Sequence, residues 1–82
     1  MWNEKLETNK INLSTNIKRL RKLNQLAQER LGLEAGVDRT VVSKIERNVS
    51  NPSLEVLVKI ATRLGVEVAD LLMRDDKHLK NK

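Results

Sequence analysis

Two hydroxyl groups and three cations recur at helical spacing between residues 39 and 47. At about 100° per residue they share one face of a helix, while three aliphatic side chains share the opposite face. The polar strip consists of Arg39, Thr40, Ser43, Lys44 and Arg47. Guanidinium, ammonium and hydroxyl groups can donate hydrogen bonds to base edges and to phosphates. The strip therefore predicts a surface that binds a polyanion.

The rest of the chain offers no constellation for catalysis or metal binding. It has one histidine, His78, no cysteine, and no glycine-rich loop that could cradle a phosphate. A nucleophile–base pair or a metal cluster needs side chains that this composition lacks. We therefore expect no enzymatic activity, no metal, no cofactor and no small-molecule ligand.

Length and charge agree with a binding module. The chain has 82 residues and a net charge of +5, and 82 residues allow one small domain. Between residues 14 and 47, eight basic residues face four acidic ones, so the basic excess coincides with the polar strip. No apolar run approaches the roughly 20 residues that span a bilayer, so we expect a soluble cytoplasmic protein with no membrane partner.

A glycine turn is expected to position the strip. One helix is predicted at about 28–35, and Gly36 ends it by accepting a left-handed backbone. Asp38 is placed to cap the next helix, which starts at Arg39. The connection is only about three residues long, so the two helices must cross steeply, and Gly32 would let their backbones approach.

Three further helices are expected around this unit. Ser14 is a good N-cap for a helix at about 14–24. Its apolar stripe would be Leu13, Ile17, Leu20 and Leu23. Residues 48–53 contain the only proline and indicate a loop, in which Asn51 or Ser53 could cap a fourth helix.

The fourth helix carries a second apolar stripe. This stripe would be Leu54, Leu57, Ile60, Ala61 and Leu64. Gly65 is expected to end the helix, and residues 66–73 to form a short fifth one. Residues 1–12 are predicted to be a flexible N-terminal segment, residues 13–73 the folded domain, and residues 74–82 a charged flexible tail.

The segments IKRLRK, QERLGLEAGVDRTVVSKIER and NPSLEVLVKIATRLGVEVADLL together carry a resemblance. The run from Leu13 to Met73 resembles the Cro/phage-repressor (XRE-like) helix-turn-helix family. Within that family, GVDRTVVSKIER and the small size look most like the controller proteins of restriction–modification systems. The resemblance implies an all-α fold, a compact bundle of five short helices like the lambda-repressor DNA-binding domain.

Geometry and resemblance together assign roles in DNA binding. A recognition helix enters the major groove with its N-terminal residues at the base edges. Base contacts are expected from Arg39, Thr40 and Lys44, with Arg39 donating two parallel hydrogen bonds to guanine. Phosphate contacts are expected from Gln28, Asp38, Ser43, Arg47, Asn48 and Asn51. The predicted function is sequence-specific transcriptional regulation.

The resemblance also pairs Arg21 with Glu46 in a partly buried structural ion pair between the first and third helices. Three residues depart from the family pattern. Ala27 replaces a Thr or Ser cap, Gly32 replaces an alanine, and Asn48 replaces a glycine after the third helix. These departures are expected to lower stability without removing a DNA contact.

One recognition helix reads only a few base pairs, so the family works as two-fold dimers on near-palindromic operators. The predicted homodimer interface is Val56, Val66, Val68, Leu71, Leu72 and Met73. RNA polymerase would be a further partner of an activator. Two alternatives stay open: an antitoxin that binds a protein partner and represses its own operon, or a phage or plasmid repressor.

Overall fold

The computed structural model describes residues 1–74, and within them the chain forms five helices and no strand. The helices are α1 (Trp2–Leu23), α2 (Gln28–Ala35), α3 (Arg39–Glu46), α4 (Leu54–Leu64) and α5 (Val68–Leu72). The predicted all-α, five-helix fold is confirmed. Apart from Arg74, the predicted charged tail, with His78, lies outside the described residues.

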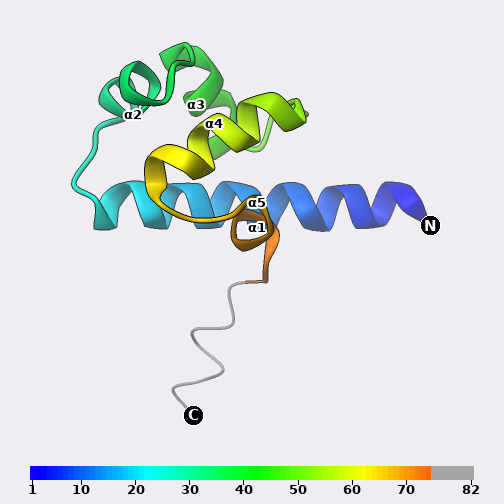
Figure 1. The fold of residues 1–82 in the computed structure, drawn as a ribbon. Coiled ribbons are helices and arrows are strands. Elements are labelled where there is room, and N and C mark those ends of the chain that lie inside the picture. The colour runs from blue at the N-terminus through cyan, green and yellow to red at the C-terminus, as the bar shows by residue number, and fades with distance from the viewer. Residues whose placement is uncertain (75–82) are drawn as a thin grey trace.

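Helix α1 is the longest helix, and α3 and α5 pack directly against it. In Figure 1, α2, α3 and α4 lie on one side of α1, and α5 lies against the middle of α1. Helix α2 packs on both α3 and α4, and α3 also contacts α1. The two helices around the glycine turn are therefore held from two directions.

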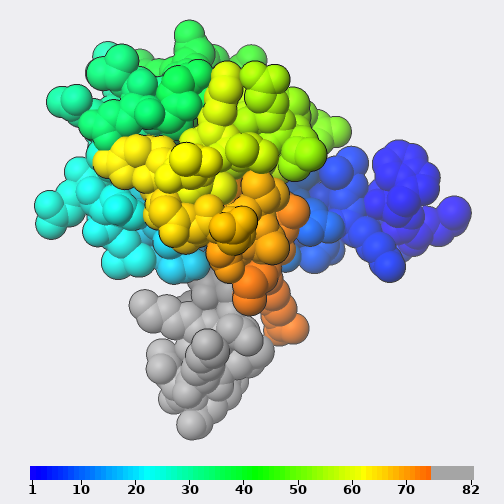
Figure 2. Space-filling model, in the orientation of Figure 1, coloured from blue at the N-terminus to red at the C-terminus, as the bar shows by residue number. Residues whose placement is uncertain are grey.

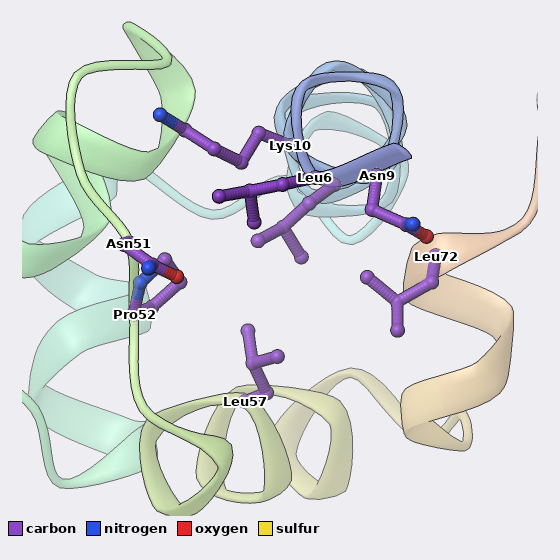
Figure 3. A pocket seen from close by; sticks show the side chains of 8 residues that line it. Leu6, Asn9, Lys10, Asn51, Pro52, Leu57 and Leu72 are labelled. Atoms are coloured by element: carbon purple, nitrogen blue, oxygen red, sulfur yellow. The ribbon is translucent and has the colours of Figure 1, made fainter. Parts of the chain in front are cut away.

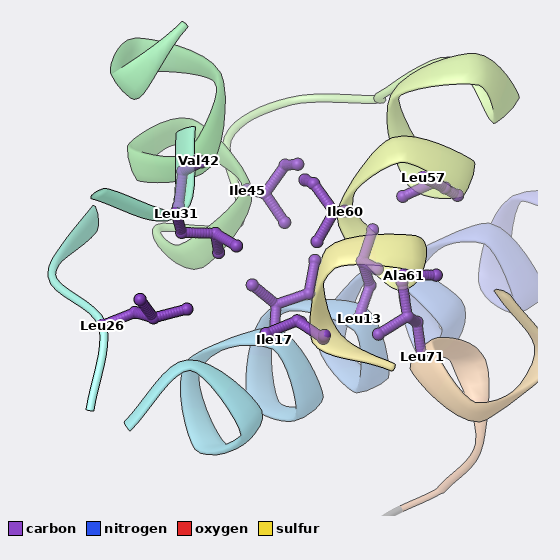
Figure 4. Packing of buried hydrophobic residues seen from close by; sticks show 11 residues of the cluster. Leu13, Ile17, Leu26, Leu31, Val42, Ile45, Leu57, Ile60, Ala61 and Leu71 are labelled. Carbon is purple, nitrogen blue, oxygen red and sulfur yellow. The ribbon is translucent and has the colours of Figure 1, made fainter. Parts of the chain in front are cut away.

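The core joins residues from all five helices (Figure 4). Leu13 and Ile17 of α1 and Leu71 of α5 are buried, as the helical spacing of α1 predicts for the first two. Two expected core residues are not buried: the side chains of Leu23 and Leu54 are each 68% exposed. Leu23 is the last residue of α1 and Leu54 the first residue of α4, so both lie at helix ends beyond the packed layer.

The predicted start of the first helix at Ser14 is wrong. Helix α1 begins at Trp2, so residues 2–12 are helical, and Ser14 lies inside the helix instead of capping it. The segment contains no glycine or proline that would interrupt the backbone. The side chains of Thr8 and Asn9 bond back to the carbonyl oxygens of the preceding turn, at 3.1 and 2.8 Å. Figure 2 shows this N-terminal part of α1 projecting from the body of the protein.

The tight turns follow the predicted chemistry. Gly36 and Gly65 end α2 and α4 in the left-handed conformation, with φ of 80° and 74°. Asn48, after α3, also has a positive φ of 60°. Of the two candidate caps for α4, Ser53 is the one that bonds the helix, accepting from the Val56 amide at 3.2 Å. Ala27 provides no side-chain cap for α2, as expected.

Gly32 lies where α2 meets the turn into α3. A Cβ atom built on Gly32 would approach the carbonyl oxygen of Val37 to 2.8 Å and the amide nitrogen of Arg39 to 3.2 Å. Both are backbone atoms, so a larger residue would force the two helices apart. The expected close approach of the two backbones is confirmed, and it fixes α3 relative to α2.

Candidate nucleic-acid interface

Helix α3 divides sharply into an inner and an outer face. On the inner face, Val42 and Ile45 are 0% and 2% exposed. On the outer face, the side chains of Arg39, Thr40 and Lys44 are exposed. Within residues 1–74, the Arg39 and Lys44 side chains make no hydrogen bond or ion pair, so these two cations are available to a ligand.

The outer face continues into the last turn of α3. Ser43 is half-buried, and its hydroxyl oxygen accepts a hydrogen bond from Arg47 Nε at 3.3 Å. Arg47 is exposed at the C-terminal end of α3. The five residues of the predicted polar strip thus lie on one side of a single eight-residue helix, although Ser43 is less accessible than the others.

The N-terminus of α3 is capped by Asp38. Its carboxylate accepts a hydrogen bond from the Thr40 amide at 2.8 Å, and this bond lowers the pKa of Asp38 below its usual value. The cap that the sequence predicts is confirmed. An ionised carboxylate repels phosphate, so the side chain of Asp38 is an unfavourable phosphate ligand.

Behind α3, a buried ion pair ties the helix to α1. Arg21 Nε donates to Glu46 Oε2 at 2.6 Å, and Arg21 Nη2 donates to Glu46 Oε1 at 3.0 Å. The two side chains are 12% and 3% exposed. The third guanidinium nitrogen of Arg21 donates to the Leu26 carbonyl at 2.7 Å. The guanidinium therefore joins α1, the loop before α2, and the end of α3.

The ionisation of Glu46 reflects two opposed effects. Burial raises the pKa of its carboxyl group, but hydrogen bonds from Arg21 and Gln28, together with the positive charges of Arg21 and Lys18, lower it more, so the pKa lies below its usual value. The same hydrogen bond to Glu46 raises the pKa of Arg21. The pair is held in its charged form by bonds within the fold.

Two further bonds to Glu46 were not anticipated from the sequence. Ser14 Oγ donates to the Glu46 carbonyl oxygen at 2.7 Å, and Gln28 Nε2 donates to Glu46 Oε1 at 3.0 Å. Glu46 is thus anchored to α1 through both its backbone and its side chain, and to α2 through Gln28. Short-range patterns cannot reveal such bonds, because Ser14 and Glu46 are 32 residues apart.

The loop after α3 contains the other expected phosphate contacts. Asn51 is exposed, whereas Asn48 is half-buried. The side-chain oxygens Asn48 Oδ1 and Ser50 Oγ are buried and have no hydrogen-bond partner among residues 1–74. Gln28, at the start of α2, precedes α3 in the chain, and Asn48 and Asn51 follow it.

The predicted dimer residues divide into buried and accessible groups. Leu71 is 0% exposed, so its expected place in an interface is wrong, because it already packs in the core of its own chain. Met73 is 59% exposed. The remaining four are half-buried on α4, α5 and the connection between them: Val56, Val66, Val68 and Leu72.

Two other kinds of site are absent from residues 1–74. No group of three or more His, Cys, Asp or Glu side chains is placed to hold a metal ion. None of the helices in this part of the chain combines the length and apolar character needed to cross a membrane.

Several known proteins are similar to this chain in sequence and in fold. Residues 17–71 match the helix-turn-helix family. The chain is 36% identical over 69 residues to the control protein C.SmaI of Serratia marcescens, covering 84% of this chain and 80% of that one. These 69 residues include more than the turn and its two helices, so the similarity extends over the helices that surround them.

Two solved structures superpose closely. The restriction–modification controller protein C.AhdI of Aeromonas hydrophila has a TM-score of 0.72 at 34% identity, covering 76% of this chain and 94% of that one. SinR, a master regulator for biofilm formation, solved in complex with DNA, has a TM-score of 0.71 at 37% identity, covering 74% and 98%. These relatives are regulators and not enzymes. The chain belongs to the XRE-like helix-turn-helix family of DNA-binding transcriptional regulators.

Proposed function

We propose that this protein is a cytoplasmic controller of a restriction–modification system, which binds a near-palindromic operator in its own promoter region as a homodimer. Helix α3 enters the major groove with Arg39, Thr40 and Lys44 at the base edges. Gln28, Ser43, Arg47, Asn48 and Asn51 hold phosphates on either side.

The observation that carries the proposal is the free outer face of α3. Arg39 is the first residue of the helix and is exposed, so its guanidinium can reach the O6 and N7 atoms of a guanine. Lys44 lies just over one turn later on the same face, within reach of a neighbouring base or phosphate. The inner face of α3 is fully used by the core, so only the outer face remains for DNA.

Dimerisation is proposed because one eight-residue helix spans too few base pairs to select an operator. Two copies related by a two-fold axis would present two α3 helices to successive major grooves, about 34–36 Å apart. The half-buried aliphatic residues at α4 and α5, with the exposed Met73, supply the contact.

The controller role is supported by the similarity to C.SmaI and C.AhdI, whose names identify them as control proteins. In this role the dimer would regulate its own promoter according to operator occupancy. Activation at low occupancy would require contact with RNA polymerase bound beside the operator.

The test is selection of bound sequences from random DNA duplexes, with the wild type and the Arg39→Ala variant. We expect the wild type to enrich a near-palindromic site. Arg39→Ala should lose preference at one symmetry-related base pair in each half-site, a discrimination of about 1–3 kcal/mol. A duplex containing the selected site, fused to a reporter gene, then measures whether occupancy activates or represses.

Lys59→Ala is the matched control, because it removes the same unit charge from α4, where Lys59 pairs with Glu55 at 3.1 Å. This variant should select the same site as the wild type. Uniform, steeply salt-dependent binding without an enriched site would contradict the proposal, since it would indicate a basic surface without base readout.

A further inference from the structure

The N-terminal turns of α1 carry apolar side chains that the rest of residues 1–74 covers only in part. Trp2 is 72% exposed, and Leu6, one turn later, is half-buried. At 3.6 residues per turn, both lie within roughly 20° of Leu13 on the helix circumference. Leu13 points into the core, so Trp2 and Leu6 continue the buried stripe of α1 past the edge of the body, where Figure 2 shows the helix projecting.

This projecting stripe borders an apolar cleft in the same chain. Leu6, Asn9, Lys10 and Leu13 of α1 form one wall of the cleft, and its other sides are lined by Asn51, Pro52, Leu57 and Leu72. The cleft has a volume of about 140 Å³. Figure 3 shows the leucine side chains of α1, α4 and α5 directed toward the space between them. The exposed Trp2 and the cleft beside Leu72 thus both lie along the N-terminal part of α1 in one molecule.

Such a pair of features is what a two-fold interface requires. In an isologous contact the same patch appears on both copies, so each patch must contain both the protrusion and the hollow that receives it. DNA is a poor occupant of this end, because residues 2–12 contain two lysines and two glutamates and carry no net charge.

The small area of the proposed dimer interface also favours a contribution from the N-terminal turns of α1. A stable interface buries about 800 Å² on each partner. Helix α5 has only five residues; Leu71 is fully buried, and Val68 and Leu72 are half-buried. A tryptophan side chain that is 72% exposed offers roughly 110–180 Å² more. Leu72 belongs both to the proposed dimer interface and to the cleft wall. The exposed stripe of α1 therefore adjoins that interface.

We propose that a second copy of this chain covers the projecting turns of α1, with Trp2 and Leu6 of each copy packing against the cleft of the other. This inference rests on the dimer of the proposed function. It assigns to the first turns of α1 a role in association.

Trp2 is the only tryptophan in the chain, so its fluorescence reports directly on this contact. The experiment is a dilution series of the full chain, with Trp2 emission and acrylamide quenching measured beside the oligomeric state by sedimentation velocity. As dimer forms, the emission maximum should move to shorter wavelength and the quenching should fall in parallel. Added DNA should not be needed for either change.

Alanine variants of α1 supply the matched comparison. Trp2→Ala and Leu6→Ala should each raise the dimer dissociation constant about tenfold or more, because they remove apolar anchors. Ile11→Ala should change it less than about twofold. Ile11 is 54% exposed but lies on the opposite side of α1 from Leu13. Alanine has the highest helix propensity, so none of the three replacements should unwind α1. Circular dichroism of each variant would check this.

The outcomes separate the two proposals. If the chain dimerises while Trp2 stays accessible to acrylamide, or if Ile11→Ala weakens the dimer as much as Trp2→Ala, the inference is overturned and the dimeric regulator stands. If the chain is monomeric at every concentration, both free and on its selected DNA, the dimer and this inference are both overturned.

Discussion

Glu46 and Arg47 are neighbours in the chain, but one lies in the interior and the other at the surface. Glu46 is 5% exposed and accepts bonds from α1 and α2, whereas Arg47 is exposed and bonds only to Ser43 within residues 1–74. The same contrast runs along α3, with Val42 and Ile45 on one face and Arg39 and Lys44 on the other. One short helix therefore carries two sets of residues, one for stability and one for binding, with little overlap.

Stability and recognition can therefore be changed separately in this helix. The inner face is bound to the rest of the fold by packing and by the Arg21–Glu46 pair. The outer face owes its orientation to that framework but contributes little to it.

Glu46→Ala should have the largest effect, a loss of about 3–5 kcal/mol in the free energy of unfolding. The variant leaves the guanidinium of Arg21, 12% exposed, without its charged partner. Urea denaturation measures the loss. Glu34→Ala is the control, because Glu34 pairs with Arg63 at 2.6 Å but both side chains are about one-third exposed. This control should lose only about 0.2–1 kcal/mol. Equal losses in the two variants would mean that burial of the Arg21–Glu46 pair does not matter.

Asp38→Ala should lower stability by less than Glu46→Ala does, because it removes only the exposed bond to the Thr40 amide. Asp38 lies at the border between the two faces, so the variant should also bind DNA non-specifically more tightly after losing a negative charge. Ser53→Ala removes the corresponding cap of α4 and should lower stability by a similar amount. A rise in stability for Asp38→Ala would contradict the capping role.

Asp38→Asn should have a smaller effect, visible only in acid. Asparagine is as good an N-cap as aspartate, so stability near neutral pH should barely change. The bond to Thr40 lowers the pKa of Asp38, so its charge-dependent stabilisation is present above the usual carboxyl pKa and is lost as pH falls through the lowered value. Below about pH 4 the wild type should therefore lose stability faster than the variant. Thermal melts of both proteins across pH 2–6 measure this difference. If the two melting temperatures fall equally with pH, the charge of Asp38 does not contribute.

Arg47→Ala should have the smallest effect on folding, within about 0.5 kcal/mol. Its effect on DNA binding should be clear: affinity falls about equally for all sequences, and the slope of log K against log salt decreases by about 1. Titrations at four salt concentrations measure this slope. A change in the preferred sequence would place Arg47 among the base contacts instead of the phosphate contacts.

Local sequence patterns were sufficient for much of the fold. The bounds of α2, the left-handed glycines at positions 36 and 65, and the cap at Asp38 were all predicted. Each depends on residues within a few positions of one another, where turn and cap chemistry is decisive. The inner face of α3 was predicted for the same reason, because three aliphatic side chains recur at helical spacing.

The errors arose where the structure depends on distant contacts or on helix ends. Ser14 resembles an N-cap, yet α1 continues through it, and its hydroxyl bonds to Glu46 instead. The spacing of Trp2, Leu6 and Leu13 was the available signal for the longer helix. Leu54 and Leu71 show that periodicity places a side chain on a face but does not say how deeply it is buried. The DNA contacts themselves stay predictions.

The close approach at Gly32 has a consequence for how such proteins diversify. Because backbone meets backbone there, a saturation library should tolerate only the smallest side chains at position 32, and even alanine requires the backbone of the turn to move. The outer positions of α3, by contrast, should accept many residues without loss of folded protein. Related proteins could therefore evolve to bind new operators by substituting a few exposed residues of α3, while the packing of α2 against α3 stays unchanged.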